Sequence, residues 1–167
     1  MPAQRGLGPH ELAELHREHY RALVRLASLL VDDVGTCEEI VQEAFVRVWR
    51  RGGPTDPTRA PAYLRSAVLN GARSHLRGRT VRRRHLAAAP EPGPSAEATA
   101  TAADDARRVL AALRTLPDRQ REVLALRYYL DLPEAEIAAT LGISPGSVKT
   151  HAHRGLRGLA ERLGAGG

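Results

Sequence analysis

A short segment near the C-terminus carries side chains that could bind the phosphates or base edges of DNA. It follows Pro145 and combines hydroxyl, imidazole, ammonium and guanidinium groups within about three helical turns. Such groups donate hydrogen bonds to phosphate oxygens and to the acceptors exposed in the major groove. The residues that we expect to contact DNA here are Ser147, Lys149, Thr150, His151, Arg154 and Arg157.

A second group of basic side chains lies between Asp56 and Glu91, where the sequence has eight arginines and no acidic residue. The exposed face of a helix normally mixes both signs of charge. A stretch of one sign repels itself unless a polyanion neutralises it. We therefore predict nucleic-acid contact in this region. A disordered basic tail beginning near Gly78 is the alternative.

Other kinds of chemistry have little support in the sequence. Two histidine pairs, His16 with His19 and His151 with His153, could suggest a metal site. However, Cys37 is the only thiol and no coherent third and fourth ligand accompanies either pair. The sequence has no Gly-rich phosphate loop and no nucleophile, base and acid set in a supporting context. We expect no catalytic residue, no metal, no cofactor and no enzymatic activity.

The C-terminal DNA-contact residues require a helix that presents them on its outer face. Pro133 suits the first position of a preceding helix, and Gly142 can take the positive φ that ends it. Ser144 can cap the next helix, with Pro145 at its first position. The expected buried stripe of that helix is Val148, Ala152 and Leu156. This pattern predicts a helix-turn-helix whose second helix enters the major groove.

Hydrophobic periodicity in the first half predicts helices over about residues 10–31, 36–51 and 61–84. Thr36 and Glu39 have the spacing of a capping box at the start of the second helix. Its apolar face is expected to include Trp49, and the inner face of the third helix to include Tyr63. The other face of the second helix is acidic first and basic at its end, which matches the helix dipole without any binding function.

Residues 87–103 contain no large apolar side chain, so they cannot build a core and are predicted to be a flexible linker. We expect an all-α protein with one small helical domain over residues 10–86 and a second over 104–163. Residues 1–9 are expected to be a loose tail. Gly155 and Gly158 are expected to weaken the last helix.

The charge of the chain is uneven. The formal net charge is +6, and 24 of the 25 basic residues are arginine. Residues 1–86 carry 15 arginines against 9 acids, so the excess lies mainly away from the helix-turn-helix. A single cysteine excludes an internal disulfide and is compatible with a reducing compartment. Because we find no secretory signal and no apolar run long enough to span a bilayer, we expect a cytoplasmic protein without membrane insertion.

The order of these parts resembles a bacterial RNA polymerase sigma factor of the extracytoplasmic-function type. The resemblance rests on EEIVQEAFVRVW at 38–49, YLRSAVLNGARSHLR at 63–77, LPDRQREVL at 116–124 and SVKT at 147–150. It covers nearly the whole chain, from about His10 to Leu163. This class has only the second and fourth sigma regions, and the sequence is most similar to its short, Arg-rich members from high-GC bacteria.

The resemblance implies a sigma factor that binds core RNA polymerase, recognises the −35 and −10 promoter elements and promotes DNA melting. Binding to core polymerase, including the β′ clamp helices and the β subunit, would use Glu39, Gln42 and Glu43. Contact with the −10 element would use Arg59, Asn70, Arg73, Ser74 and Arg77. The −35 element would be read by the six residues of the C-terminal segment. An anti-sigma protein is a further candidate partner.

Two other functions stay open on the sequence alone. A LuxR-like regulator would share the helix-turn-helix and bind duplex DNA unaided, but its N-terminal half should resemble a sensor or receiver domain. A polymerase-binding factor that no longer initiates would not need Asn70 or the recognition helix. Ser74 and His151 differ from the residues common in the family at these positions. These two departures leave the promoter sequence open. The sequence also does not determine the regulon, the inducing signal or the relative placement of the domains.

Overall fold

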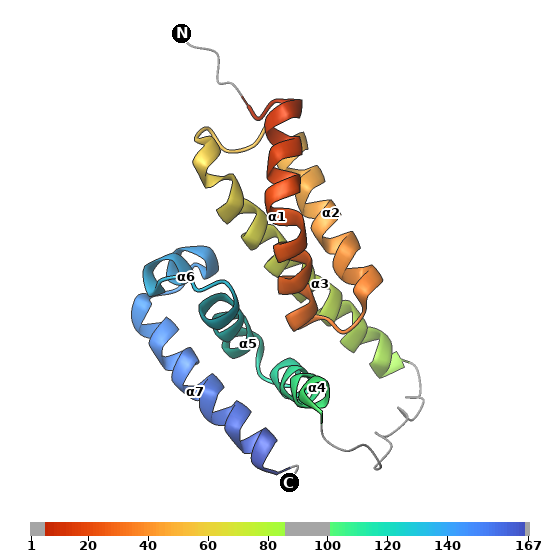
Figure 1. The fold of residues 1–167 in the computed structure, drawn as a ribbon, viewed down its shortest axis with the longest axis vertical. Helices are drawn as coiled ribbons and strands as arrows, with labels where there is room; N and C mark the ends of the chain where they lie inside the picture. Colours follow the sequence, from red (N-terminus) through yellow and green to blue (C-terminus); the bar gives the residue numbers. More distant parts are fainter. Residues whose placement is uncertain (1–5, 86–100, 166–167) are drawn as a thin grey trace.

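The computed structural model describes residues 6–85 and 101–165, and all its regular elements in these ranges are helices (Figure 1). The predicted all-α fold is thereby confirmed. We call residues 6–85 the N-terminal half and residues 101–165 the C-terminal half. The predicted linker over 87–103 lies outside the described residues except at 101–103, where the prediction was wrong because a helix already begins at Ala102. No helix in the described ranges is long and apolar enough to cross a membrane.

The N-terminal half is a bundle of three helices, α1 (Pro9–Leu30), α2 (Val34–Arg50) and α3 (Ala60–His85), with a 3₁₀ turn at Pro57–Arg59 before α3. The C-terminal half contains α4 (Ala102–Arg114), α5 (Asp118–Leu124), α6 (Glu134–Leu141) and α7 (Pro145–Gly164). A π-helical turn, Ala125–Tyr129, extends α5.

The start of α2 differs from the prediction. Asp33, and not Thr36, is its N-cap, because the Asp33 carboxylate accepts hydrogen bonds from the Thr36 hydroxyl at 2.5 Å and the Thr36 backbone N–H at 2.9 Å. These two bonds, the hydroxyl first, lower the pKa of Asp33 below its ordinary value. The helix consequently begins two residues earlier than expected.

The segment before α1 is ordered by contact with the turn that follows α2. The Leu7 side chain is buried, and its backbone N–H donates to the Gly52 carbonyl at 2.8 Å. Gly53 has a φ of +73°, and a Cβ there would lie 2.5 Å from Leu7 Cδ1, so only glycine lets this turn approach. The prediction of a loose tail was wrong for residues 6–9, since Pro9 is already the first residue of α1.

The last helix packs differently from the predicted stripe. Leu156 is 43% exposed, whereas Gly155 is buried against α5. A Cβ at Gly155 would lie 3.0 Å from Leu124 Cδ1, so this glycine lets α7 come close to α5. The prediction of a buried Leu156 was wrong because the contact side of α7 runs through Val148, Ala152 and Gly155.

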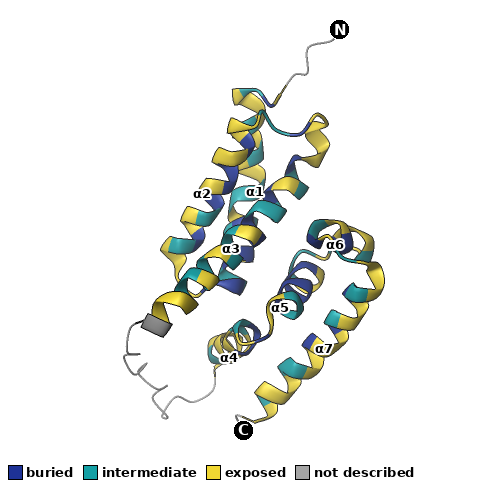
Figure 2. Ribbon diagram, turned by 180° about the vertical axis from the view of Figure 1, so that it is seen from behind, coloured by how far each residue is buried: buried dark blue, intermediate teal, exposed yellow. Residues whose placement is uncertain are grey.

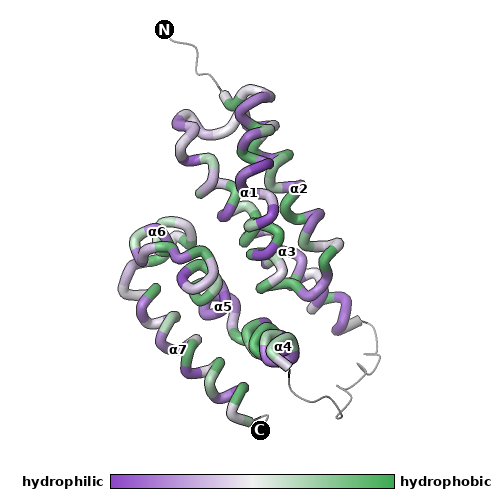
Figure 3. The backbone as a smooth tube through the Cα atoms, viewed as in Figure 1, coloured by the Kyte–Doolittle hydropathy of each residue, from purple (hydrophilic) through white to green (hydrophobic). Residues whose placement is uncertain are grey.

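The two halves pack against each other along their length. In Figures 1 and 2, α1 and α3 lie beside α4, α5 and α6, while α7 lies on the far side of the C-terminal half. Buried side chains of both halves, such as Leu26, Val68, Leu126 and Ile137, belong to one hydrophobic cluster. In the hydropathy colouring of Figure 3, α1 and α5 carry both polar and apolar positions, and apolar residues of both, such as Leu26 and Val123, are buried. The apolar faces therefore build a core that continues from one half into the other.

Candidate nucleic-acid interface

The turn between α6 and α7 has the geometry that the sequence predicts for a helix-turn-helix. Gly142 ends α6 in the left-handed region at φ 65° and ψ 37°. Ser144 caps α7, accepting from the Ser147 backbone N–H at 3.1 Å, and Pro145 is the first helical residue. Pro133 is the N-cap of α6 and not its first residue, so α6 begins one residue later than expected.

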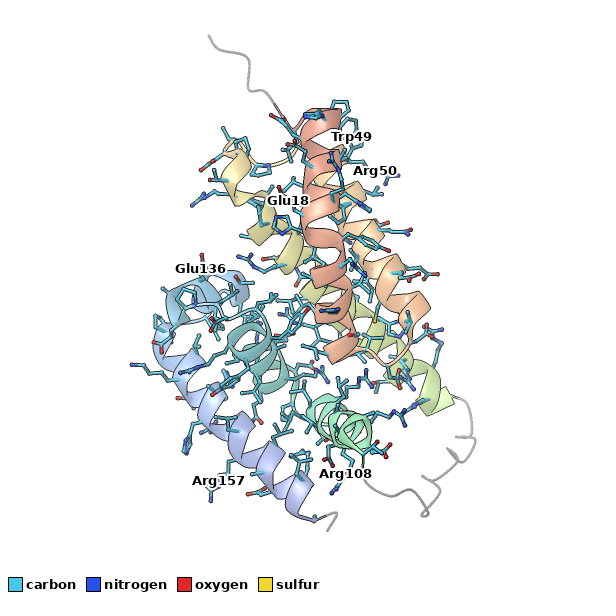
Figure 4. All side chains as sticks on the ribbon, viewed as in Figure 1. Glu18, Trp49, Arg50, Arg108, Glu136 and Arg157 are labelled. Atoms are coloured by element: carbon cyan, nitrogen blue, oxygen red, sulfur yellow. The ribbon has the colours of Figure 1, made fainter. Side chains whose placement is uncertain are left out.

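Four of the six predicted −35 residues lie exposed along α7. Lys149 is mainly solvated, with its Nζ 3.9 Å from a Glu134 carboxylate oxygen. Arg157 points away from the rest of the protein (Figure 4), and its Nε lies 3.7 Å from Glu161. Arg154 and Thr150 are also exposed, and the Thr150 hydroxyl donates to the Gly146 carbonyl at 3.1 Å. Long cationic side chains on this surface are free to reach phosphates or guanine edges.

The other two predicted −35 residues are less available. The Ser147 hydroxyl shares a 2.9 Å hydrogen bond with the Ser144 hydroxyl and is half-buried in the cap of α7. His151 is also half-buried, and its Nδ1 is shielded from solvent without a hydrogen-bond partner. The helix therefore offers its outer face mainly through Lys149, Arg154 and Arg157.

The predicted −10 residues begin in the turn before α3. Asp56 accepts hydrogen bonds from the Thr58 hydroxyl at 2.7 Å and from its backbone N–H at 3.0 Å. These bonds cap the 3₁₀ turn and lower the pKa of Asp56, the hydroxyl bond first, because they stabilise its charged carboxylate. The turn ends at Arg59, whose side chain is exposed.

Along α3, the remaining −10 residues share one side of the helix because they are spaced three or four apart. Asn70, Ser74 and Arg77 are exposed. Arg73 is not, because its guanidinium is bound to Glu122 of α5. The Asn70 side-chain oxygen accepts a hydrogen bond from Arg73 Nη1 at 3.2 Å. The structure thus brings these residues together but leaves Arg73 already occupied.

Two aromatic residues expected to face inward are exposed instead. Trp49 at the end of α2 is 45% exposed, and Tyr63 at the start of α3 is 54% exposed. The label in Figure 4 places Trp49 near the top of the bundle, next to Arg50. Exposed aromatic rings among arginines can stack on unpaired bases. Each ring lies close to basic residues in the sequence, and this could have indicated that it is exposed. The apolar spacing of the two helices pointed instead to a buried position.

The residues predicted to bind core polymerase lie on the outer side of α2. Glu39, Gln42 and Glu43 are all exposed. Glu39 and Glu43 line a groove of about 340 Å³ between α2 and α3. The two helices approach closely here, since a Cβ at Gly71 would lie 2.9 Å from Ile40 Cγ2. This acidic surface is separate from the cations of α7.

The charged side chains of these surfaces can bind other molecules. Over residues 6–85 and 101–165, no group of three His, Cys, Asp or Glu side chains is placed to hold a metal ion. Cys37 is buried, which raises the pKa of its thiol mainly through desolvation. The exposed cations of α7 and α3 can neutralise phosphates, and the carboxylates of α2 can bind a basic protein surface.

Models of two protein families match the chain. The model described as Sigma-70 region 2 matches residues 15–82, and the model described as Sigma-70, region 4 matches residues 106–159. The two matches fall in the N-terminal and C-terminal halves respectively. The order of the two regions is that expected from the resemblance.

Similar proteins extend over both halves. RNA polymerase sigma-E factor of Streptomyces coelicolor is 35% identical over 154 residues, which cover 92% of this chain and 86% of that protein. The ECF RNA polymerase sigma factor SigL of Mycobacterium tuberculosis is 31% identical over 87% of this chain and 84% of its own length. The solved structure of CnrH in complex with the cytosolic domain of CnrY is 27% identical and superposes with a TM-score of 0.68, covering 92% of this chain and 88% of CnrH. The chain therefore belongs to the sigma-70 family of RNA polymerase sigma factors, in its extracytoplasmic-function class.

Proposed function

We propose that this sigma factor binds core RNA polymerase through Glu39, Gln42 and Glu43, and reads a −35 element through α7. The observation that carries the proposal is the exposure of Lys149, Arg154 and Arg157 on the second helix of a capped helix-turn-helix. A helix held in this way can enter the major groove with its cations directed at DNA. The protein then acts as an initiation factor in the cytoplasm and not as an enzyme.

The same proposal assigns the melting of the −10 element to α3 and the turn before it. Asn70, Ser74 and Arg77 are exposed on one side of α3, and Arg59 is exposed at the end of the preceding turn. Trp49 and Tyr63 add aromatic faces for unpaired bases. These residues suit single-stranded DNA, whose bases must be held outside the duplex.

A protein inhibitor is a further proposed partner. CnrH, which covers both halves of this chain in superposition, was solved with the cytosolic domain of another protein. An anti-sigma protein would control this factor by covering one or both halves.

In-vitro transcription tests the proposal. Core polymerase from the source organism is combined with the protein on a pool of its genomic fragments, and the 5′ ends of the transcripts are mapped. Transcripts that start only with the protein present, from sites that share upstream elements, are expected. Tight binding to duplex DNA by the protein alone, with no transcript, would instead favour a stand-alone regulator.

Single substitutions test whether core binding uses the acidic residues of α2 and whether transcription from −35-dependent promoters uses the cations of α7. Glu43→Gln should weaken binding to core polymerase, whereas Arg154→Ala should leave core binding intact and reduce transcription from −35-dependent promoters. Arg21→Ala removes an exposed arginine of α1 and serves as the control for charge alone. Equal effects of all three variants would contradict the separation of the surfaces.

A further inference from the structure

Besides the shared apolar core, the two halves are joined by a set of polar contacts, which we call the seam. We define the seam by Ser28, Ser66 and Arg73 of the N-terminal half and Arg114, Glu122 and Thr140 of the C-terminal half. Arg114 Nη2 donates to the Ser28 carbonyl at 2.6 Å, and the Ser66 hydroxyl donates to the Thr140 carbonyl at 3.4 Å. The third contact, between Arg73 and Glu122, is ionic.

Glu122 is buried at the centre of the seam. Its side chain is only 1% exposed, and that of Arg73 is 23% exposed. Arg73 Nε donates to one carboxylate oxygen and Nη2 donates to the other at 3.0 Å. Arg119 Nη1 adds a third hydrogen bond at 3.3 Å. Two parallel N–H···O bonds of this kind form the fork with which a guanidinium also holds a phosphate.

We call the form in which the two halves are in contact the closed form. In this form the protein cannot contact both promoter elements at once. About 25 base pairs separate positions −35 and −10, which is roughly 85 Å of B-form DNA at 3.4 Å per step. A compact chain of this length has a radius of gyration of about 15 Å. The halves must therefore separate along the seam before α7 and α3 can reach their elements on one promoter.

We propose that Glu122 is an internal substitute for a DNA phosphate. It holds Arg73 in the closed form and thereby prevents the free protein from binding the −10 strand. Opening of the seam exchanges the carboxylate for a phosphate at the same guanidinium. This inference rests on the proposed recognition of the −10 element by α3 and extends it to Arg73, which the family resemblance also assigns to that element. Glu122 takes no part in the proposed binding of DNA or polymerase.

The free energy of the Arg73–Glu122 ion pair is compatible with reversible opening and closing of the two halves. A buried ion pair contributes little net stability, because the desolvation of both charges offsets their attraction. Removal of one partner is costly, since it leaves the other charge in the seam without compensation. Glu122→Gln should therefore shift the protein toward the open form, where Arg73 is hydrated.

The first test measures the distance between the halves in the full-length protein alone. Spin labels are placed on exposed positions of α1 and α7, with Ala13→Cys and Ala160→Cys, and the distance distribution is recorded by pulsed electron resonance. The parent should give one short distance, and Glu122→Gln a longer and broader distribution. Asp105→Asn, which removes an exposed acid of α4, is the matched control and should resemble the parent. A short distance retained in Glu122→Gln would overturn the inference.

The second test measures binding of a fluorescent single-stranded oligonucleotide that carries the −10 sequence found by transcription mapping. If the closed form makes up about nine-tenths of the parent, Glu122→Gln should bind roughly tenfold more tightly. Arg73→Ala should abolish this gain. An open Glu122→Gln protein with unchanged affinity would overturn the exchange of carboxylate for phosphate. If Arg73→Ala in the Glu122→Gln background loses no affinity, the assignment of Arg73 to DNA is wrong, whereas the distance measurement still judges the closure.

A locked variant keeps the inference testable if Glu122→Gln folds poorly. Ser66→Cys and Thr140→Cys place thiols on either side of the seam, where a short bis-maleimide reagent can join them in the closed form. The crosslinked protein should lose oligonucleotide binding, while the same double variant without reagent should keep it. Binding retained after crosslinking would contradict the inference.

Discussion

Helices α3 and α7 are both long and basic, but they meet the rest of the protein in different ways. The cations of α7 lie in solvent with loose partners, such as the 3.9 Å approach of Lys149 to Glu134. On α3, Arg73 is held by a carboxylate that is almost fully buried. The proposed −35 surface is therefore preformed in the closed protein, whereas Arg73 of the proposed −10 surface becomes available only when the halves move apart. The presence of a cation on a helix therefore does not show that it is free to bind DNA. That depends on whether another side chain of the protein already binds it.

The largest expected effect is a loss of stability in the hydrophobic core that joins the half containing α3 to the half containing α7. Leu126 is fully buried in the cluster shared by both halves, and Leu126→Ala should cost about 2–5 kcal/mol of unfolding free energy through lost burial and a cavity. Leu156→Ala, on the exposed side of α7, should change it by about 0.5 kcal/mol or less. Urea unfolding of both variants checks the pair. Similar losses would mean that α7 is buried on both sides, and the comparison would fail.

The next effect tests the preformed surface of α7. Lys149→Ala and Arg154→Ala should each weaken −35-dependent initiation by about 1–3 kcal/mol if they contact bases. Transcription from promoters with single-base changes in the −35 element separates base contacts from phosphate contacts. Promoter selectivity that stays unchanged in both variants would remove these residues from the readout.

A smaller effect is expected for Asn70 on α3. Asn70→Ala should reduce open-complex formation by about 1 kcal/mol, the net value of a typical hydrogen bond, with little change in duplex binding. Reactivity of unpaired thymines to permanganate measures the opening, and a gel shift of the closed complex measures duplex binding. Loss of duplex binding alone would show that α3 acts like α7, and the proposed melting role would be wrong.

The smallest effect is expected at Asp33, which caps α2 in the N-terminal half. It tests how much the charge of a single capping carboxylate contributes to stability. Because the pKa of Asp33 is lower in the folded protein, its charged form contributes stability that is present above the unfolded pKa. This contribution is lost as the pH falls through the folded pKa, below about pH 4. Asp33→Asn keeps a capping side chain, so its disadvantage in urea unfolding should be seen at about pH 6 and disappear at about pH 2. A disadvantage that is equal at both pH values would contradict the role of the charge.

Local rules predicted the helix-turn-helix well. Gly142 must take a positive φ, Ser144 must accept from the Ser147 N–H, and Pro145 must precede the hydrogen-bonded part of α7. Each requirement involves residues within a few positions of one another, so the sequence pattern alone determines it. The cap at Asp33 was missed for a related reason. The capping-box spacing of Thr36 and Glu39 favoured Thr36 as the cap, whereas the Asp33 carboxylate, three residues earlier, accepts two hydrogen bonds from Thr36.

Side-chain exposure was harder to predict. Trp49, Tyr63 and Leu156 follow apolar spacing, but within residues 6–85 and 101–165 no neighbouring element covers them. Periodicity identifies a face of a helix without stating how wide the covering surface is. The buried position of Gly155 depends equally on the path of α5, which brings Leu124 against it.

By itself, the sequence determined the helical class, the caps and turn of the helix-turn-helix, and the family resemblance, since these depend on neighbouring residues and on motif order. Only the tertiary structure placed Glu122 against Arg73, 49 positions away in the chain. Neither residue is exceptional in its own helix. Their pairing arises because the apolar faces of α1, α3 and α5 share one core, and burial then requires each charge to find the other.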